Sequence, residues 1–120
     1  MRKRSNPEGL PYELYTPVKG ANMKKKKKIA KDFPVRVKVI RVEKSPCSFG
    51  HKAGDTWIFK GGKTVAGICG AAFNVIFPYW RVLRFGGSFP WEKDKDKVHI
   101  CCPDPESCVV FELTRLKESE

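Results

Sequence analysis

Val35-Arg-Val-Lys-Val-Ile-Arg-Val-Glu-Lys44 is the stretch in which the sequence signals its secondary structure most clearly. Its first valines alternate with charged residues, and this period of two predicts a strand with one buried face. After Val39 the apolar positions move by one residue, to Ile40 and Val42. We expect a β-bulge there, because one extra residue in the strand restores the buried face.

A second strand and a helix are predicted to follow. Residues 55–60 alternate in the same way as the first strand and end in a Gly-Gly turn. From residue 68 to residue 84 the apolar period becomes helical. Pro78 interrupts this segment, so a kink or a break into two short helices is expected. The apolar stripe predicted to face the core comprises Ile68, Ala72, Val75, Ile76, Tyr79, Val82 and Leu83.

The C-terminal part of the chain predicts a loop and a hairpin. Residues 84–91 form a glycine-rich aromatic loop, in which paired glycines supply positive φ and Phe85, Phe89 and Trp91 fold back over the core. Residues 97–102 and 108–114 alternate as the two strands of a hairpin, with His99 and Cys101 on the solvent-facing side. The element order β-β-α-β-β predicts a small α+β domain over residues 35–117. Its mainly antiparallel sheet is expected to be covered by one kinked helix.

The N-terminal third is basic and differs from the rest of the chain. The net charge is +11, and residues 1–34 carry ten basic and three acidic side chains. Residues 24–28 are five consecutive lysines, which repel one another. We therefore expect residues 1–34 to be a disordered tail that attracts polyanions without sequence specificity. Met23 directly precedes the lysine run, so translation from Met1 and from Met23 are both consistent with the sequence.

The remaining bulk features bear on the compartment. No apolar run of about eighteen residues is present, so no membrane-spanning helix is predicted. The basic start Met1-Arg-Lys-Arg is not followed by the apolar segment of a signal peptide, which indicates a cytoplasmic protein. The five cysteines cannot all pair internally. In the cytoplasm they are expected as thiols or metal ligands.

Three cysteines and one histidine predict a metal centre. Cys47 and His51 lie on a glycine-rich turn between the first two strands, Cys69 precedes the helix, and Cys102 ends a strand. The helix N-terminus favours a thiolate at Cys69. Thiolate and imidazole are the usual ligands of zinc, and of iron when sulfur dominates. The predicted ligands are therefore Cys47, His51, Cys69 and Cys102, and the predicted cofactor is zinc or an iron–sulfur cluster.

Other interpretations of these residues stay open. The chain has no C-x-x-C pair, and free cysteines often pack as small apolar residues, so an inert core is one alternative. A second is a reactive thiol, with His51 as base to Cys47 or Cys69 and Asp55 orienting the ring. Asp55 is also placed to cap the turn before the second strand. His99 is expected to be a solvated residue at the sheet edge.

The basic residues support a different alternative, a module that binds nucleic acid. The lysine run would contact phosphates, and aromatic side chains beside the arginines of the helix would stack on bases. The residues of this alternative site are Lys24, Lys25, Lys26, Lys27, Lys28, Arg81 and Arg84.

Three motifs carry a resemblance to a known family. They are Cys47-x-x-Gly50-His51-Lys52-x-Gly54-Asp55, Arg84-Phe-Gly-Gly-x-Phe-Pro-Trp-Glu92, and Cys102-Pro-Asp-Pro-Glu106 followed by Val109-Val-Phe-Glu-Leu113. Residues 35–116 resemble an uncharacterised family of short bacterial and archaeal proteins without an established activity. The resemblance favours Cys47, Cys69 and Cys102 over Cys101 and Cys108 as site residues, and gives weight to His51.

Together these features predict a small cytoplasmic accessory protein of a prokaryote that binds a metal or an iron–sulfur cluster. Because the chain is too short to enclose a large substrate pocket, it is expected to act as a small subunit or partner of a redox enzyme rather than as an enzyme by itself. A nucleic-acid-binding module and a small thiol-dependent enzyme are the two rival predictions.

Overall fold

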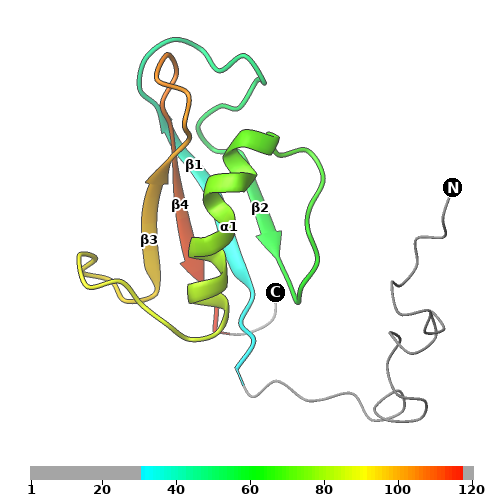
Figure 1. The fold of residues 1–120 in the computed structure, drawn as a ribbon, viewed down its shortest axis with the longest axis vertical. Coiled ribbons are helices and arrows are strands. Elements are labelled where there is room, and N and C mark those ends of the chain that lie inside the picture. The colour runs from blue at the N-terminus through cyan, green and yellow to red at the C-terminus, as the bar shows by residue number, and fades with distance from the viewer. Residues whose placement is uncertain (1–30, 118–120) are drawn as a thin grey trace, which may run out of the picture. The chain divides into compact units, whose positions relative to one another are not determined.

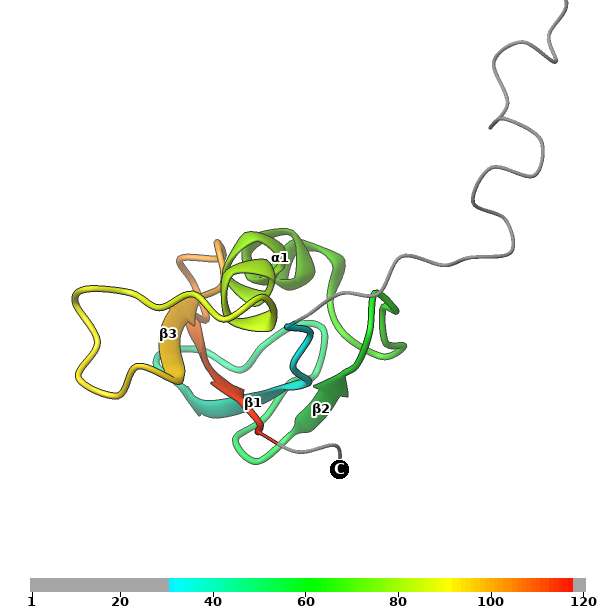
Figure 2. The same cartoon turned by 90° about the horizontal axis from the view of Figure 1, so that it is seen from below.

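A computed structural model describes residues 31–117 of the chain. The described elements are β1 (Val35–Val42), β2 (Thr56–Phe59), α1 (Gly70–Arg84), β3 (Lys97–Cys101) and β4 (Val109–Arg115). The four strands form one antiparallel sheet in the order β2-β1-β4-β3, and α1 lies across one face of it (Figures 1 and 2). The predicted α+β class and the element order are confirmed. The predicted lysine cluster at residues 24–28 lies outside the described residues.

β1 is a central strand of the sheet and carries much of the core. Val35, Val37 and Val39 have no exposed surface, as their alternation predicted. The expected bulge is present, because Val39 pairs with Phe111 whereas Arg41 pairs with the adjacent residue of β4. Ile40 is the extra residue, and the register continues beyond it to the end of β1. The bulge thus keeps β1 paired with β4 up to the loop that carries Cys47.

α1 runs as one helix through Pro78 and does not break into two. Its buried side chains follow the helical period, at Ala72, Ile76, Trp80 and Leu83. The predicted stripe was wrong at its C-terminal end, since Val82 is 36% exposed and Trp80 is buried. The large indole of Trp80 fits over β2, where its ring centroid lies 4.8 Å from that of Phe59. With Trp80 packed against β2, Val82 lies on the exposed side of α1.

The loop after α1 needs both of its glycines, for different reasons. Gly86 has a φ of +92°, which side chains rarely adopt. Gly87 packs against the helix, and a Cβ there would lie 2.7 Å from Cγ1 of Val82. Only part of the predicted aromatic cluster covers the core. Phe89 is buried, but Phe85 lies under the Arg84 guanidinium at 37% exposure and Trp91 is 64% exposed.

Arg115 ties the C-terminal ends of β4 and α1 together, a role that the sequence did not reveal. Its guanidinium donates to the carbonyl oxygens of Leu83 at 3.0 Å, Gly87 at 2.6 Å and Lys95 at 2.9 Å. It also pairs with the Asp96 carboxylate at 2.7 Å and lowers the pKa of that group. The Arg115 side chain thus links the C-terminal end of α1, the glycine-containing loop after it and the charged turn before β3.

Residues just before β1 belong to the same unit. The Phe33 amide donates to the Arg84 carbonyl at 2.8 Å, and the Leu116 amide donates to the Pro34 carbonyl at 2.8 Å. The compact unit therefore begins at Lys31. Within the described residues, no helix is long and apolar enough to cross a membrane.

Candidate thiol and imidazole site

The four predicted metal ligands line a single cavity of about 190 Å³. Four segments form it: the loop after β1, the N-terminal end of α1, the start of the turn between β3 and β4, and the beginning of β4. These segments meet at the end of the sheet where α1 begins (Figure 1). The lining residues are Cys47, Ser48, Phe49, His51, Cys69, Ala71, Ala72, Cys102, Pro103, Asp104, Val109 and Phe111.

The cavity does not hold a preformed set of metal ligands. Across residues 31–117, no three side chains of His, Cys, Asp or Glu converge closely enough to bind a metal ion. The three thiols share the cavity without pointing at one centre. Binding a metal would therefore require these side chains to rearrange.

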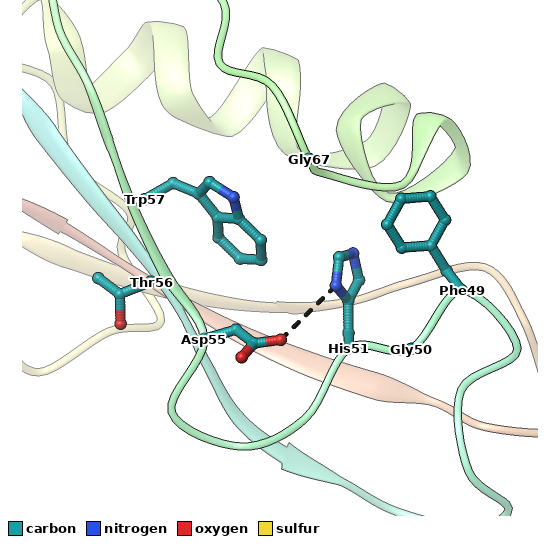
Figure 3. A pocket seen from close by; sticks show the side chains of 7 residues that line it. All are labelled: Phe49, Gly50, His51, Asp55, Thr56, Trp57 and Gly67. Atoms are coloured by element: carbon teal, nitrogen blue, oxygen red, sulfur yellow. Dashed lines mark ion pairs between the residues drawn. The ribbon is translucent and has the colours of Figure 1, made fainter.

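His51 is buried, and both of its ring nitrogens face polar groups. Its Nε2 accepts a hydrogen bond from the backbone N–H of Cys69 at 3.1 Å. Its Nδ1 lies 3.8 Å from Oδ2 of Asp55, and the dashed line in Figure 3 marks this approach. Because Nε2 accepts, the ring proton belongs on Nδ1, and the imidazole is neutral. Burial lowers the pKa of His51, and the Asp55 charge opposes this shift.

Aromatic rings surround the imidazole and fix its plane. The ring centroid of His51 lies 4.7 Å from that of Phe49, 5.2 Å from that of Trp57 and 6.1 Å from that of Phe111. Phe49, Trp57 and the carboxylate of Asp55 also line a second, open hollow beside the ring (Figure 3). The sequence interpretation missed Phe49 and Trp57 as neighbours of the site. Their closeness to His51 along the chain was the one signal available.

The turn from Gly50 to Asp55 holds His51 in place. Gly50 has a φ of +104° and Gly54 a φ of +102°, conformations that strongly favour glycine. Asp55 accepts a hydrogen bond from the Lys52 N–H at 3.0 Å, so its carboxylate caps the turn as well as facing the imidazole. Both roles considered for Asp55 therefore fit its position.

The helix N-terminus opens into the cavity. Cys69 is the N-cap residue, but its side chain makes no capping hydrogen bond. Ala71 and Ala72 of the first turn line the cavity wall. The N–H groups of this turn and the helix dipole favour negative charge nearby. A thiolate in the cavity would be stabilised by this end of the helix.

Cys102 is the best anchored of the three thiols. Its backbone N–H donates to the Val109 carbonyl at 2.9 Å, and its Sγ accepts from the Val109 N–H at 3.3 Å. The turn that follows is tied to the loop before Cys47, because the Ser107 hydroxyl donates to the Pro46 carbonyl at 3.2 Å. The two loops that contribute Cys47 and Cys102 are thus held side by side.

Other residues singled out in the sequence lie elsewhere. His99 is on the face of the sheet away from α1, where its ring nitrogens lie 3.2 Å from Glu92 and 3.1 Å from Glu112. Arg84 pairs with Asp32 at 2.6 Å, which leaves its guanidinium already engaged. Arg81 is exposed on the outer side of α1, with its guanidinium carbon 5.8 Å from the centroid of the Phe77 ring.

No protein-family model, curated protein or solved structure matches this chain. What the protein does must therefore be inferred from its own residues. The cavity shared by three thiols, a neutral imidazole and a helix N-terminus is the feature with the clearest chemistry.

Proposed function

We propose that the protein binds a thiophilic metal centre, zinc or an iron–sulfur cluster, through the thiolates of Cys47, Cys69 and Cys102. The observation that carries this proposal is that three cysteines from three separate segments line one small cavity. Thiolates prefer zinc, monovalent copper and iron–sulfur centres over harder cations. The positive end of α1 would offset part of the charge of the thiolates.

We place His51 beside the ligand set rather than in it. Its Nε2 already accepts the Cys69 N–H, and its other ring nitrogen faces Asp55. To bind a metal, the ring would have to give up the first hydrogen bond and leave a backbone donor of the helix unpaired. The simpler role for His51 is to hold Cys69 and the start of α1 at the cavity.

Three thiolates leave one coordination position for another ligand. Closed four-ligand sites are typical of structural zinc, whereas three protein ligands with an open position are typical of reactive or transferring sites. We therefore propose a role as a small subunit or partner of a redox enzyme, in the cytoplasm, where thiols stay reduced.

Metal analysis of protein purified without oxygen tests this proposal. We expect stoichiometric zinc without colour, or iron and sulfide with visible absorption. Cys47→Ala, Cys69→Ala and Cys102→Ala should each lose most of the metal. Cys101→Ala is the matched control, since this cysteine is on the opposite face of the sheet and should keep it. Metal-free protein that is fully folded and takes up neither zinc nor iron with sulfide would end the proposal.

A specific observation also supports a second candidate, a small thiol-dependent enzyme. His51 and Asp55 form an oriented pair at the cavity that the thiols line. In such an enzyme the imidazole would take a proton from Cys47 or Cys69. This candidate predicts one cysteine that is alkylated much faster than the others near neutral pH, and slowed by His51→Gln. Alkylation of Cys47 and Cys69 no faster than that of the other cysteines would remove it.

A further inference from the structure

Two cysteines outside the cavity lie in contact. The Sγ atoms of Cys101 and Cys108 are 2.9 Å apart, although the residues are seven positions apart in the sequence. A disulfide bond has an S–S distance of about 2.05 Å, so an approach of less than about 1 Å would bring the two sulfurs to bonding distance.

The hairpin itself produces this contact. Cys101 is the last residue of β3 and pairs with Val110, so Cys108 lies at the diagonal position across the ladder. Diagonal neighbours are ordinarily too far apart for short side chains to touch. Cys108, however, has a φ of 56°, and its N–H donates to the Asp104 carbonyl at 2.9 Å. This left-handed residue ends the turn, and its thiol reaches that of Cys101.

The pair is separate from the candidate metal site. Successive residues of a strand point to opposite faces of the sheet, so Cys101 is exposed on the open face while Cys102 lines the cavity. Cys108 is half-buried. A small solute can therefore reach Cys101 from solvent without entering the cavity.

We propose that Cys101 and Cys108 form a redox-active dithiol that closes reversibly to a disulfide by exchange with a low-molecular-weight disulfide. One protein thiolate attacks the small disulfide, forms a mixed disulfide and releases one small thiol. The second protein thiolate then attacks the protein sulfur of the mixed disulfide and releases the other small thiol. The protein loses two hydrogens and the small disulfide gains two, so atoms and electrons balance.

The surroundings of the pair fit this role. Cys101 is exposed to solvent and Cys108 is half-buried, so a small disulfide can reach the first sulfur while the second lies in contact with it. The strain of a left-handed non-glycine residue at Cys108 is of a kind often found at functional positions.

Thiol mapping of the full chain tests the proposal. Reduced protein is equilibrated with mixtures of reduced and oxidised glutathione, quenched with acid and alkylated. Residues 98–115 contain no lysine or arginine before Arg115, so trypsin leaves Cys101, Cys102 and Cys108 on one peptide. A second cleavage after Glu106 separates the first two cysteines from the third. A disulfide keeps the two fragments joined.

We expect two of the five thiols to disappear together as the mixture becomes oxidising, with the fragments joined and the reaction reversed by a reducing mixture. Cys101→Ser and Cys108→Ser should each abolish the joined fragments. Cys102→Ser, a substitution next in sequence to Cys101, should keep them. Five free thiols in the folded wild-type protein at every ratio of reduced to oxidised glutathione would overturn the proposal. It would also be overturned if Cys102→Ser abolished the joined fragments.

Discussion

Replacing His51 tests whether the imidazole holds the start of α1 at the cavity. His51→Phe keeps a planar ring among Phe49, Trp57 and Phe111 but removes the acceptor for the Cys69 N–H. His51→Gln is the matched variant, because the amide oxygen of its longer side chain can lie near the position of Nε2 and accept the same hydrogen bond.

The magnitude follows from the lost acceptor. A part-buried donor left without a partner costs about 1 to 3 kcal/mol. In a domain of this size that corresponds to a fall in Tm of roughly 5 to 20 °C for His51→Phe. We expect His51→Gln to recover at least half of this loss, because it restores the acceptor at the expense of some aromatic packing.

The pH dependence gives an independent readout. Since burial lowers the pKa of His51 below its ordinary value of 6.5, the unfolded chain binds this proton more readily than the folded one. The contribution of His51 to stability is therefore present above pH 6.5 and is lost as the pH falls below it. A difference between wild type and His51→Gln should grow toward pH 7.5 and shrink toward pH 5.5, because other groups cancel in the comparison.

Urea denaturation followed by circular dichroism, at both pH values, measures these effects. The reasoning would be refuted if His51→Phe were as stable as the wild type at pH 7.5. It would also be refuted if the wild type and His51→Gln lost stability equally between pH 7.5 and pH 5.5.

Three further predictions concern the frame of the domain and its tail. Gly87→Ala should lower the free energy of unfolding by about 1 to 3 kcal/mol, because its Cβ would overlap the side chain of Val82, and thermal melts check this. Arg115→Met should lower it by about 2 to 4 kcal/mol by leaving three carbonyls without this donor and removing the shorter ion pair of Asp96, whereas the exposed Lys117→Met control should change it by less than about 0.5 kcal/mol. If the tail binds nucleic acid, the affinity of the protein for a random DNA duplex should fall steeply with salt, and deletion of residues 1–30 should abolish binding. Unchanged binding after the deletion would mean that the basic residues of the helix bind the duplex instead.

Much of the fold could be predicted because short-range patterns determine it. The alternating valines of β1 predicted its buried face, and the one-residue shift of the apolar positions after Val39 predicted the bulge. These features depend on neighbours within a few residues. The predicted stripe included Val82 and did not include Trp80, and packing against β2 buries Trp80 while Val82 stays exposed.

The candidate site was harder to predict because its residues come from distant parts of the chain. The sequence placed Cys47 and His51 on one turn, but the hydrogen bond from the Cys69 N–H depends on where α1 begins in space. That position follows from the strand order β2-β1-β4-β3, which periodicity does not give. Arg115 was missed for the same reason, since its acceptors belong to three other segments.

The contact between Cys101 and Cys108 also lay beyond sequence reasoning. Alternation placed Cys101 on the open face correctly. The positive φ of Cys108 is unusual for a residue other than glycine, and nothing in its residue type signals it. The family resemblance favours the other three cysteines and gives no weight to these two.

Site-resolved alkylation in the presence and absence of zinc tests the central claim most directly. Reduced protein is treated briefly with a thiol reagent, and the modified fraction of each cysteine is measured by mass spectrometry. If three thiolates of the cavity bind the metal, zinc will protect Cys47, Cys69 and Cys102 together, and Cys101 and Cys108 will react as before. Equal rates with and without zinc, or protection confined to Cys101 and Cys108, would contradict the account.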